Sequence, residues 1–198
     1  MSLELPGFAD PVLGAQSAFR AILEAMSRPG TIQQVGAELT PPAPLCQSAA
    51  AVLLTLADAD TTLHLGEGCA DAAEWIAFHC GAPVTPDIAT AEFALALQMP
   101  KLAGLDQGTD DAPEHSGTII LQVADVNAGT TYQIAGPGLK APTTMRIAGL
   151  PDDFVAQWSA NHGLAPRGVD LILCAGSQLI ALPRSLAITL IARMGGLT

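Results

Sequence analysis

Basic residues are scarce in this chain of 198 residues. Eight lysines and arginines stand against 19 aspartates and glutamates, which gives a formal net charge of −11 at pH 7. A surface with this charge repels polyanions, so the composition argues against DNA, RNA or an anionic membrane as a partner. It leaves open a small phosphorylated ligand, because a few arginines or backbone N–H groups are enough to bind one phosphate.

Long apolar runs are absent as well. No stretch reaches the roughly 18 consecutive apolar residues that a membrane-spanning helix needs. The N-terminal MSLELPGFADP lacks the basic start and apolar core of a signal peptide. Aromatic residues make up only 4% of the chain, although 49% of it is apolar. We therefore predict a soluble cytoplasmic protein with a large core of Ala, Leu, Ile and Val.

Motifs for metal binding and for nucleophilic catalysis are missing. The four cysteines, at positions 46, 69, 80 and 174, form no C-x-x-C pair, which favours reduced thiols. The four histidines have no metal-ligand spacing, and neither G-x-S-x-G nor a P-loop occurs. His79 shares a predicted helix face with Trp75, near the end of that helix, where a structural role is favoured. The sequence therefore predicts no metal site and identifies no catalytic residue.

What is present begins with a well-marked helix. It starts at Asp10-Pro11 and ends at the Pro-Gly of positions 29 and 30, because aspartate caps helices and proline suits their first turn. Apolar residues recur at three- and four-residue spacing and form one face. They are Val12, Ala15, Phe19, Leu23 and Met26. On another face Arg20, Glu24 and Arg28 follow at four-residue spacing, which favours ion pairs.

The rest of the chain alternates predicted helices and strands. Helices are predicted at about 45–57, 71–80 and 152–161, the middle one opened by Asp71 with Glu74 in a capping box. Strands are predicted at about 31–35, 62–65 and 91–97, and a hairpin from 118–126 and 130–135 around residues 127–129. The acidic stretch 100–117 is predicted to be a long surface loop. No linker divides the chain, so we predict one α/β domain over residues 1–198, with three layers and a mixed β-sheet between helices.

Near the C-terminus, GVDLILCAGSQLIALPRS predicts a second hairpin with a three-residue loop, Ala175–Ser177. If Cys174 faces Gln178, then Asp170 and Arg184 lie on one face as diagonal neighbours. An ion pair that fixes the strand register is favoured over a ligand-binding site on this geometry.

Two features resemble parts of cofactor sites, but the residues around them do not complete such sites. A pyridoxal phosphate enzyme needs a lysine as its Schiff base, together with an acid and a phosphate cup. The chain has only Lys101 and Lys140, both in predicted loops beside prolines. The stretch Gly136–Ala141 matches G-x-G-x-x-A, but Pro142 follows and no helix is predicted there, so we interpret it as a glycine-rich loop.

Several ordered segments resemble the PhnH subunit family of bacterial carbon–phosphorus lyase, over nearly the whole chain. They are Phe19-Arg20, Leu23, Ala25–Ser27, Pro29-Gly30, LLTLADADT at 53–61, Phe78-His79, Gly108-Thr109 with Pro113, TIILQVA at 118–124, and GVDLIL and LIALPR at 168–173 and 179–184. Each segment is common by itself, and their order is what makes the resemblance specific.

The resemblance implies a subunit of the complex that displaces adenine from ATP with an alkylphosphonate. With methylphosphonate, the product is alpha-D-ribose 1-methylphosphonate 5-triphosphate. It also implies a fold like the large domain of pyridoxal phosphate-dependent transferases, without the cofactor. The implied partners are a second copy of the chain and the other core subunits. Contact with ATP or alkylphosphonate inside the complex stays open.

The positions that match the family's recurrent polar residues are Arg20, His79, Asp170 and Arg184, which become candidates for binding or for an interface. The resemblance attributes the chemistry to partner subunits, so it assigns this chain no catalytic residue and no cofactor. Two alternatives stay open: a free-standing pyridoxal phosphate transferase using Lys101 or Lys140, and a module that binds a phosphorylated metabolite through Arg20, Arg28 or Arg184.

Overall fold

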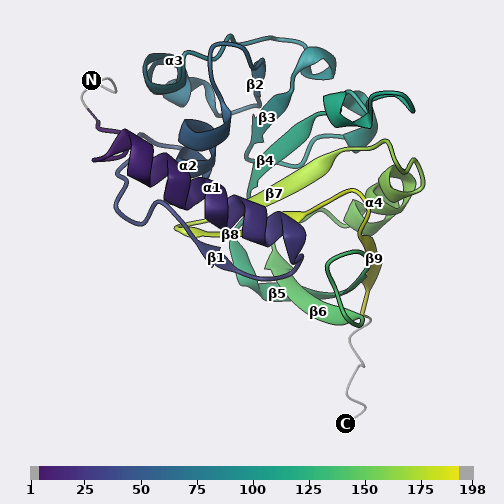
Figure 1. Ribbon diagram of the computed structural model, residues 1–198. Helices are drawn as coiled ribbons and strands as arrows, with labels where there is room; N and C mark the ends of the chain where they lie inside the picture. The colour runs from purple at the N-terminus through teal and green to yellow at the C-terminus, as the bar shows by residue number, and fades with distance from the viewer. Residues whose placement is uncertain (1–4, 192–198) are drawn as a thin grey trace.

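The computed structural model describes residues 5–191, which form two β-sheets and four α-helices (Figure 1). The larger sheet has six strands in the order β1-β8-β7-β4-β3-β2. In that order they are Gln33–Gln34, Gln178–Leu182, Asp170–Ala175, Thr118–Gln122, Phe93–Ala96 and Leu63–Leu65. Strands β2, β3, β4 and β7 run parallel, whereas β8 and β1 are antiparallel to their neighbours. The predicted α/β class with a mixed sheet is confirmed.

The inner strands of this sheet are buried on both faces. Residues 119–121 of β4 and 171–174 of β7 are at most 1% exposed. Continuous apolar runs of this kind are typical of parallel strands that are covered on both sides. Because side chains alternate along a strand, neighbouring residues of β4 and β7 enter two different cores.

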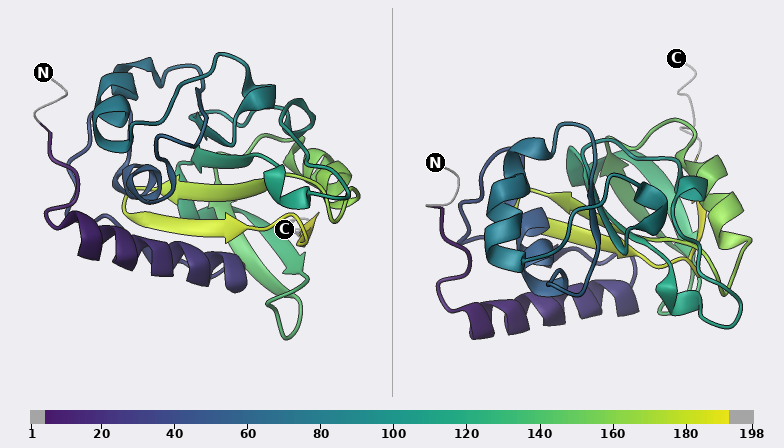
Figure 2. Two further views of the ribbon diagram at one scale, coloured as in Figure 1. Left: turned by 45° about the horizontal axis from the view of Figure 1, so that its top comes forward. Right: turned by 90° about the horizontal axis from the view of Figure 1, so that it is seen from above.

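Helices cover one face of the sheet. They are α1 (Pro11–Ser27), α2 (Gln47–Leu56) and α3 (Ala73–Cys80). The predicted cap of α1 is confirmed, because Oδ1 of Asp10 accepts hydrogen bonds from the N–H groups of Val12 and Leu13, both at 3.0 Å. Helix α1 packs against α2 and lies along β8 (Figure 2). The side chains that it buries there are Ala18, Ile22 and Ala25.

A second sheet and one helix cover the other face. The sheet consists of β6 (Thr143–Ala148), β5 (Asp125–Ala135) and β9 (Ala187–Leu190) in that order, and the helix is α4 (Phe154–His162). Helices therefore lie on both faces as predicted, whereas the smaller sheet beside α4 was not predicted. In β6, Met145 and Ile147 are buried and Thr144 and Arg146 are exposed, and this alternation gives the single apolar face that a packed sheet needs.

The hairpin predicted from 118–126 and 130–135 is wrong. Strand β4 lies between β3 and β7 in the larger sheet, whereas β5 belongs to the smaller sheet and pairs with β6 and β9. The residues taken for the turn form an irregularity inside β5, between the pairings of Asp125 and Thr130. Gly129, at φ +88°, makes this irregularity possible, because a Cβ there would lie 2.6 Å from the carbonyl oxygen of Ile147.

Two local predictions also need correction. Asp71 does not cap α3, because it lies in a 3-10 turn (Ala70–Ala72) and the helix starts after Ala72 without a side-chain cap. In the C-terminal hairpin Cys174 pairs with Leu179, and Ala175 pairs with Gln178. The turn is thus two residues long, and the register differs from the predicted one by one residue.

Candidate functional site

Asp170 and Arg184, two of the four residues selected from the sequence, form a partly buried ion pair. Oδ1 of Asp170 accepts a 2.6 Å hydrogen bond from the backbone N–H of Arg184 and a 3.1 Å bond from its Nε. Oδ2 lies 2.5 Å from Nη2. Both side chains are 17% exposed. The two residues therefore meet as predicted, although the hairpin register that was meant to bring them together is different.

Arg184 also holds two other segments of the chain. Its Nη1 donates a hydrogen bond of 2.6 Å to the carbonyl oxygen of Pro113, and Nδ1 of His162 lies 3.1 Å from the carbonyl oxygen of Arg184. The contact with Pro113 fastens the acidic stretch 100–117 to the start of β7. All three guanidinium nitrogens contact acceptors of the chain itself, so this arginine acts as a clamp between segments.

His79 fastens the N-terminal segment to α3. Its Nε2 lies 3.1 Å from the carbonyl oxygen of Leu5, which also accepts a 2.9 Å hydrogen bond from Nε1 of Trp75. A carbonyl oxygen only accepts hydrogen bonds, so the ring carries a proton on Nε2. The two rings are in contact, with centroids 4.6 Å apart. The predicted pairing of His79 with Trp75 is found, and its common partner Leu5 had no signal in the sequence.

Arg20 differs from the other three residues because it is exposed on α1. The predicted ion ladder of α1 forms only in part: Nη1 of Arg28 lies 2.8 Å from Oε1 of Glu24. Among the ion pairs of residues 5–191, none includes Arg20. The structure therefore brings Asp170 and Arg184 together and leaves His79 and Arg20 at separate places.

A cavity of about 530 Å³ lies beside the segment that the clamp holds. Its walls include Glu92, Asp106 and Glu114, together with His115 and Ser116. Three carboxylates repel a triphosphate or a phosphonate. The acidic composition of 100–117 was the available signal for this cavity, but the part of the wall that comes from β3 could not be seen in the sequence.

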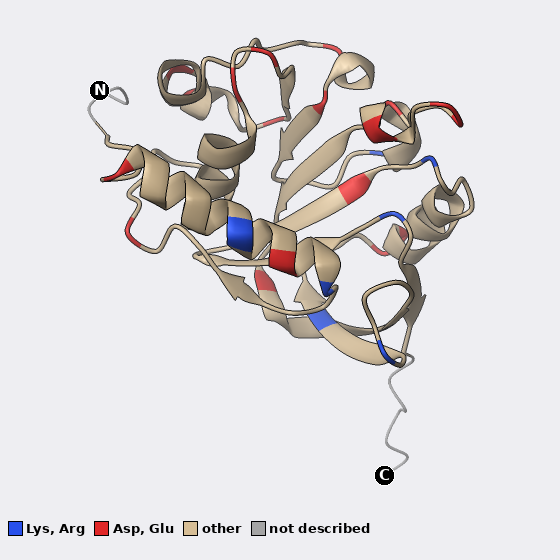
Figure 3. Ribbon diagram, in the orientation of Figure 1, with Lys and Arg blue, Asp and Glu red and all other residues tan. Residues whose placement is uncertain are grey.

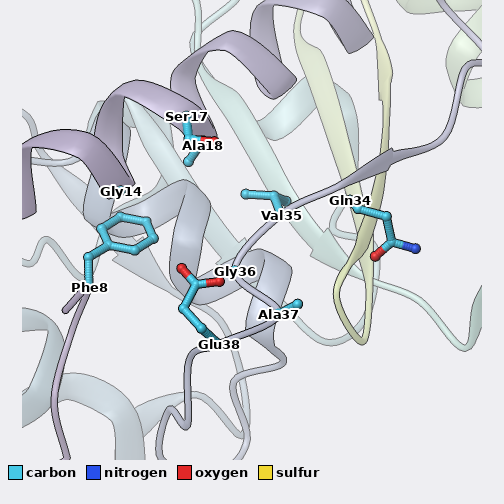
Figure 4. A pocket seen from close by; sticks show the side chains of 9 residues that line it. All are labelled: Phe8, Gly14, Ser17, Ala18, Gln34, Val35, Gly36, Ala37 and Glu38. Atoms are coloured by element: carbon cyan, nitrogen blue, oxygen red, sulfur yellow. The ribbon is translucent and has the colours of Figure 1, made fainter. Parts of the chain in front are cut away.

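A second cavity, of about 160 Å³, lies between the first half of α1 and the segment after β1 (Figure 4). The ring of Phe8 lies against Gly14, where a Cβ would come within 2.5 Å of the ring. The carboxylate of Glu38 is the one charged group among its lining residues. This cavity has no basic side chain with which to hold a phosphate.

Both lysines are exposed at the surface. Nζ of Lys101 lies 2.5 Å from Oδ2 of Asp153, and this hydrogen bond lowers the pKa of the aspartate. Lys140 is exposed and lies within the glycine-rich loop. In that loop a Cβ at Gly138 would lie 2.3 Å from the carbonyl oxygen of Ser27. The glycine thus allows the loop to approach the end of α1, as suits a structural loop.

Two further observations concern residues 5–191. Their His, Cys, Asp and Glu side chains form no group of three or more that could hold a metal ion. None of their helices combines the length and the apolar character required to cross a membrane.

Comparison with known proteins places these features in a family. The model of the family described as bacterial phosphonate metabolism protein (PhnH) matches residues 6–189. The chain is 39% identical, over 183 residues, to the alpha-D-ribose 1-methylphosphonate 5-triphosphate synthase subunit PhnH of Rhizobium meliloti (strain 1021), covering 90% of this chain and 92% of that protein. It is 28% identical over 186 residues to the putative C-P lyase subunit protein HtxG of Stutzerimonas stutzeri, covering 88% and 86%. The chain therefore belongs to the PhnH family of bacterial phosphonate metabolism proteins.

Proposed function

We propose that this chain is a subunit of the carbon–phosphorus lyase core complex, needed for forming alpha-D-ribose 1-methylphosphonate 5-triphosphate from ATP and methylphosphonate. The observation that carries the proposal is the 39% identity to a protein named as a subunit of that synthase, over nine-tenths of this chain. The match spans both sheets and all four helices of the described residues, so it concerns the whole fold.

Within the complex, the role that we propose is assembly. Three of the four selected polar residues, His79, Asp170 and Arg184, hold segments of the chain to one another. The cavity beside the clamp is lined by carboxylates, which disfavour ATP and phosphonate. These contacts support a subunit whose residues build a surface, while partner subunits bind the nucleotide and carry out the reaction.

The remaining parts of the proposal follow from the family. We propose a cytoplasmic chain that folds as one unit, forms a homodimer by itself and binds the other core subunits. We also propose that its fold shares the topology of the large domain of pyridoxal phosphate-dependent transferases without the cofactor. The parallel strands β2, β3, β4 and β7, inside a mixed sheet, are compatible with that topology. The four free thiols suit a reducing compartment.

Growth on methylphosphonate as the sole phosphorus source tests the subunit role. In a Rhizobium meliloti strain that lacks its own PhnH, we expect this chain to restore growth, and we expect the K101A/K140A variant to do so equally well. No growth with a stably expressed wild-type chain would contradict the role in this pathway. Loss of growth in the lysine variant alone would revive the pyridoxal phosphate alternative.

Calorimetry on the isolated chain tests the assembly role. We expect no heat of binding on titration with ATP or methylphosphonate, since neither of the cavities described above is lined by a lysine or an arginine. Saturable binding that is lost in the Arg20→Ala or Arg28→Ala variant would instead support the metabolite-binding alternative.

A further inference from the structure

Helix α1 has an apolar stripe that its own fold does not use. Val12 is 75% exposed, Phe19 is 50% exposed and Leu23 is 56% exposed. Their spacing of seven and four residues places them on one side of the helix. The core contacts of α1 are made by Ala18, Ile22 and Ala25 on the adjoining side. The stripe therefore adds little to folding and leaves large apolar side chains in water.

Arg20 flanks this stripe, one residue beyond Phe19. It is exposed, and none of the ion pairs within residues 5–191 includes it. Glu24, at the favourable four-residue spacing, pairs with Arg28 instead. Helix α1 thus presents apolar side chains next to an arginine that is in none of the ion pairs of residues 5–191. Figure 3 shows the acidic and basic positions along the ribbon of this chain, whose net charge is −11.

We propose that this stripe, Val12, Phe19 and Leu23 together with Arg20, is the docking surface for another subunit of the complex. The segment that it fits has apolar side chains at helical spacing and an aspartate or glutamate that faces Arg20. This inference rests on the proposed function, since that function supplies the partner subunits. It adds the surface and the chemistry of the segment that the surface binds.

A second copy of the chain fits the same surface poorly. If α1 packs antiparallel on its own copy around the middle of the stripe, near Phe19, then Arg20 meets the Arg20 of the copy. Two like charges at that place destabilise the pairing.

A membrane surface fits poorly as well. Helices that lie on anionic membranes have polar faces rich in lysine and arginine. The exposed polar positions of α1 include Asp10 at its start and Glu24 beside Arg20. An acidic and apolar protein segment fits both the stripe and Arg20.

Co-purification with the other core subunits tests the docking surface. The chain is co-expressed with the core subunits encoded in the same genome, and the recovered complex is weighed by native mass spectrometry. Three chains are compared with wild type: F19S/L23S, R20E and the control F78S/V84S. The control residues are exposed to a similar degree, 65% and 49%, but they lie outside α1. Serine is about as good a helix former as phenylalanine and a weaker one than leucine, so unfolding in urea is measured for each variant to show that it is folded.

We expect F19S/L23S and R20E each to lower the recovery of the complex at least tenfold, while the control behaves as wild type. Full recovery of F19S/L23S would overturn the docking surface and leave the subunit role intact. Full recovery of R20E alone would overturn the acidic partner segment. If F19S/L23S turns an isolated dimer into a monomer, the stripe binds a second copy and the inference is wrong. Failure of the wild-type chain to co-purify would count against the proposed function itself.

Discussion

The ion pair of Asp170 and Arg184 shows how one carboxylate can organise three segments. It accepts hydrogen bonds from both the backbone and the guanidinium of Arg184, and the guanidinium in turn binds the carbonyl oxygen of Pro113. At 17% exposure neither charge is well hydrated, so each depends on the other. Removing one partner of such a pair leaves the other charge buried and uncompensated, which costs more than the pair itself contributes.

Replacing Asp170 by asparagine should therefore lower the free energy of unfolding by about 2–4 kcal/mol, the range for breaking a buried, hydrogen-bonded charge pair. Urea unfolding followed by circular dichroism measures the change. The matched control is Glu24→Gln, which breaks an exposed pair whose side chains are 41% and 68% exposed. The control should cost less than about 1 kcal/mol. Equal effects of the two changes would show that the Asp170 pair is no clamp.

The thiol of Cys80 gives the folded chain a dependence on alkaline pH. Burial raises its pKa from 9.0 to about 11, and Sγ lies 3.6 Å from the carbonyl oxygen of Leu53. Because the folded chain binds this proton more tightly than the unfolded chain, the stabilisation is fully present below pH 9. It is lost as the pH rises through the interval from 9 to about 11.

The Cys80→Ala variant should therefore lose less free energy of unfolding than wild type between pH 9 and 11. Burial also raises the pKa of Cys69, Cys174 and Tyr132, so the wild-type loss has several sources and only the difference reports Cys80. Urea titrations at pH 8, 9, 10 and 11 give that difference. Parallel curves for the two proteins would mean that Cys80 ionises at the same pH in both states.

At the scale of elements, local signals decided what could be predicted. Asp10 and Pro11 mark the start of α1, and the Pro-Gly at 29 and 30 marks its end. Both predicted ends agree with the structure. The partners of β5 had no such local signal. Strand β6 follows the glycine-rich loop but was not predicted as a strand, and β9 pairs with β5 over a long sequence separation, as in Ala135 with Ala187.

Among the candidate residues, too, contacts with a local signal could be predicted and contacts between distant residues could not. The meeting of Asp170 and Arg184 was foreseen because both lie at the ends of one hairpin. The contact of Arg184 with Pro113 joins residues 71 positions apart, and it depends on how stretch 100–117 folds back. The outward direction of the stripe on α1 also could not be seen. Apolar periodicity shows that a helix has an apolar face, but not whether that face lies in the core.

The cap of α1 yields a prediction at this scale. Replacing Asp10 by alanine removes the acceptor for two N–H groups and should lower the free energy of unfolding by about 1 kcal/mol. Asp10→Asn is the control, since an asparagine cap is about as good and should keep most of that stability. Urea unfolding of both variants measures it. Equal losses in the two variants would show that the carboxylate acts through its charge and not as a cap.

For the molecule as a whole, the central strands matter most because they belong to both cores. In β4, Ile120 faces the helices, whereas Ile119 and Leu121 face the smaller sheet. In β7, Ile172 and Leu171 divide in the same manner. Neither layer can lose its packing without exposing one face of strands that the other layer also packs against. This shared sheet is the physical argument that the two layers unfold together.

The two tryptophans make that argument testable, because each is buried in one of the two cores. Trp75 of α3 is fully buried among the helices, and Trp158 of α4 is fully buried on the other face. In W158F the fluorescence of Trp75 therefore reports the helical layer, and in W75F that of Trp158 reports the opposite layer. In each variant we expect the urea midpoint by fluorescence to match the midpoint by circular dichroism, as a cooperative two-state transition requires. Fluorescence and circular dichroism midpoints that differ within either variant would mean that one layer unfolds before the other, and the proposal of one folding unit would then have to be given up.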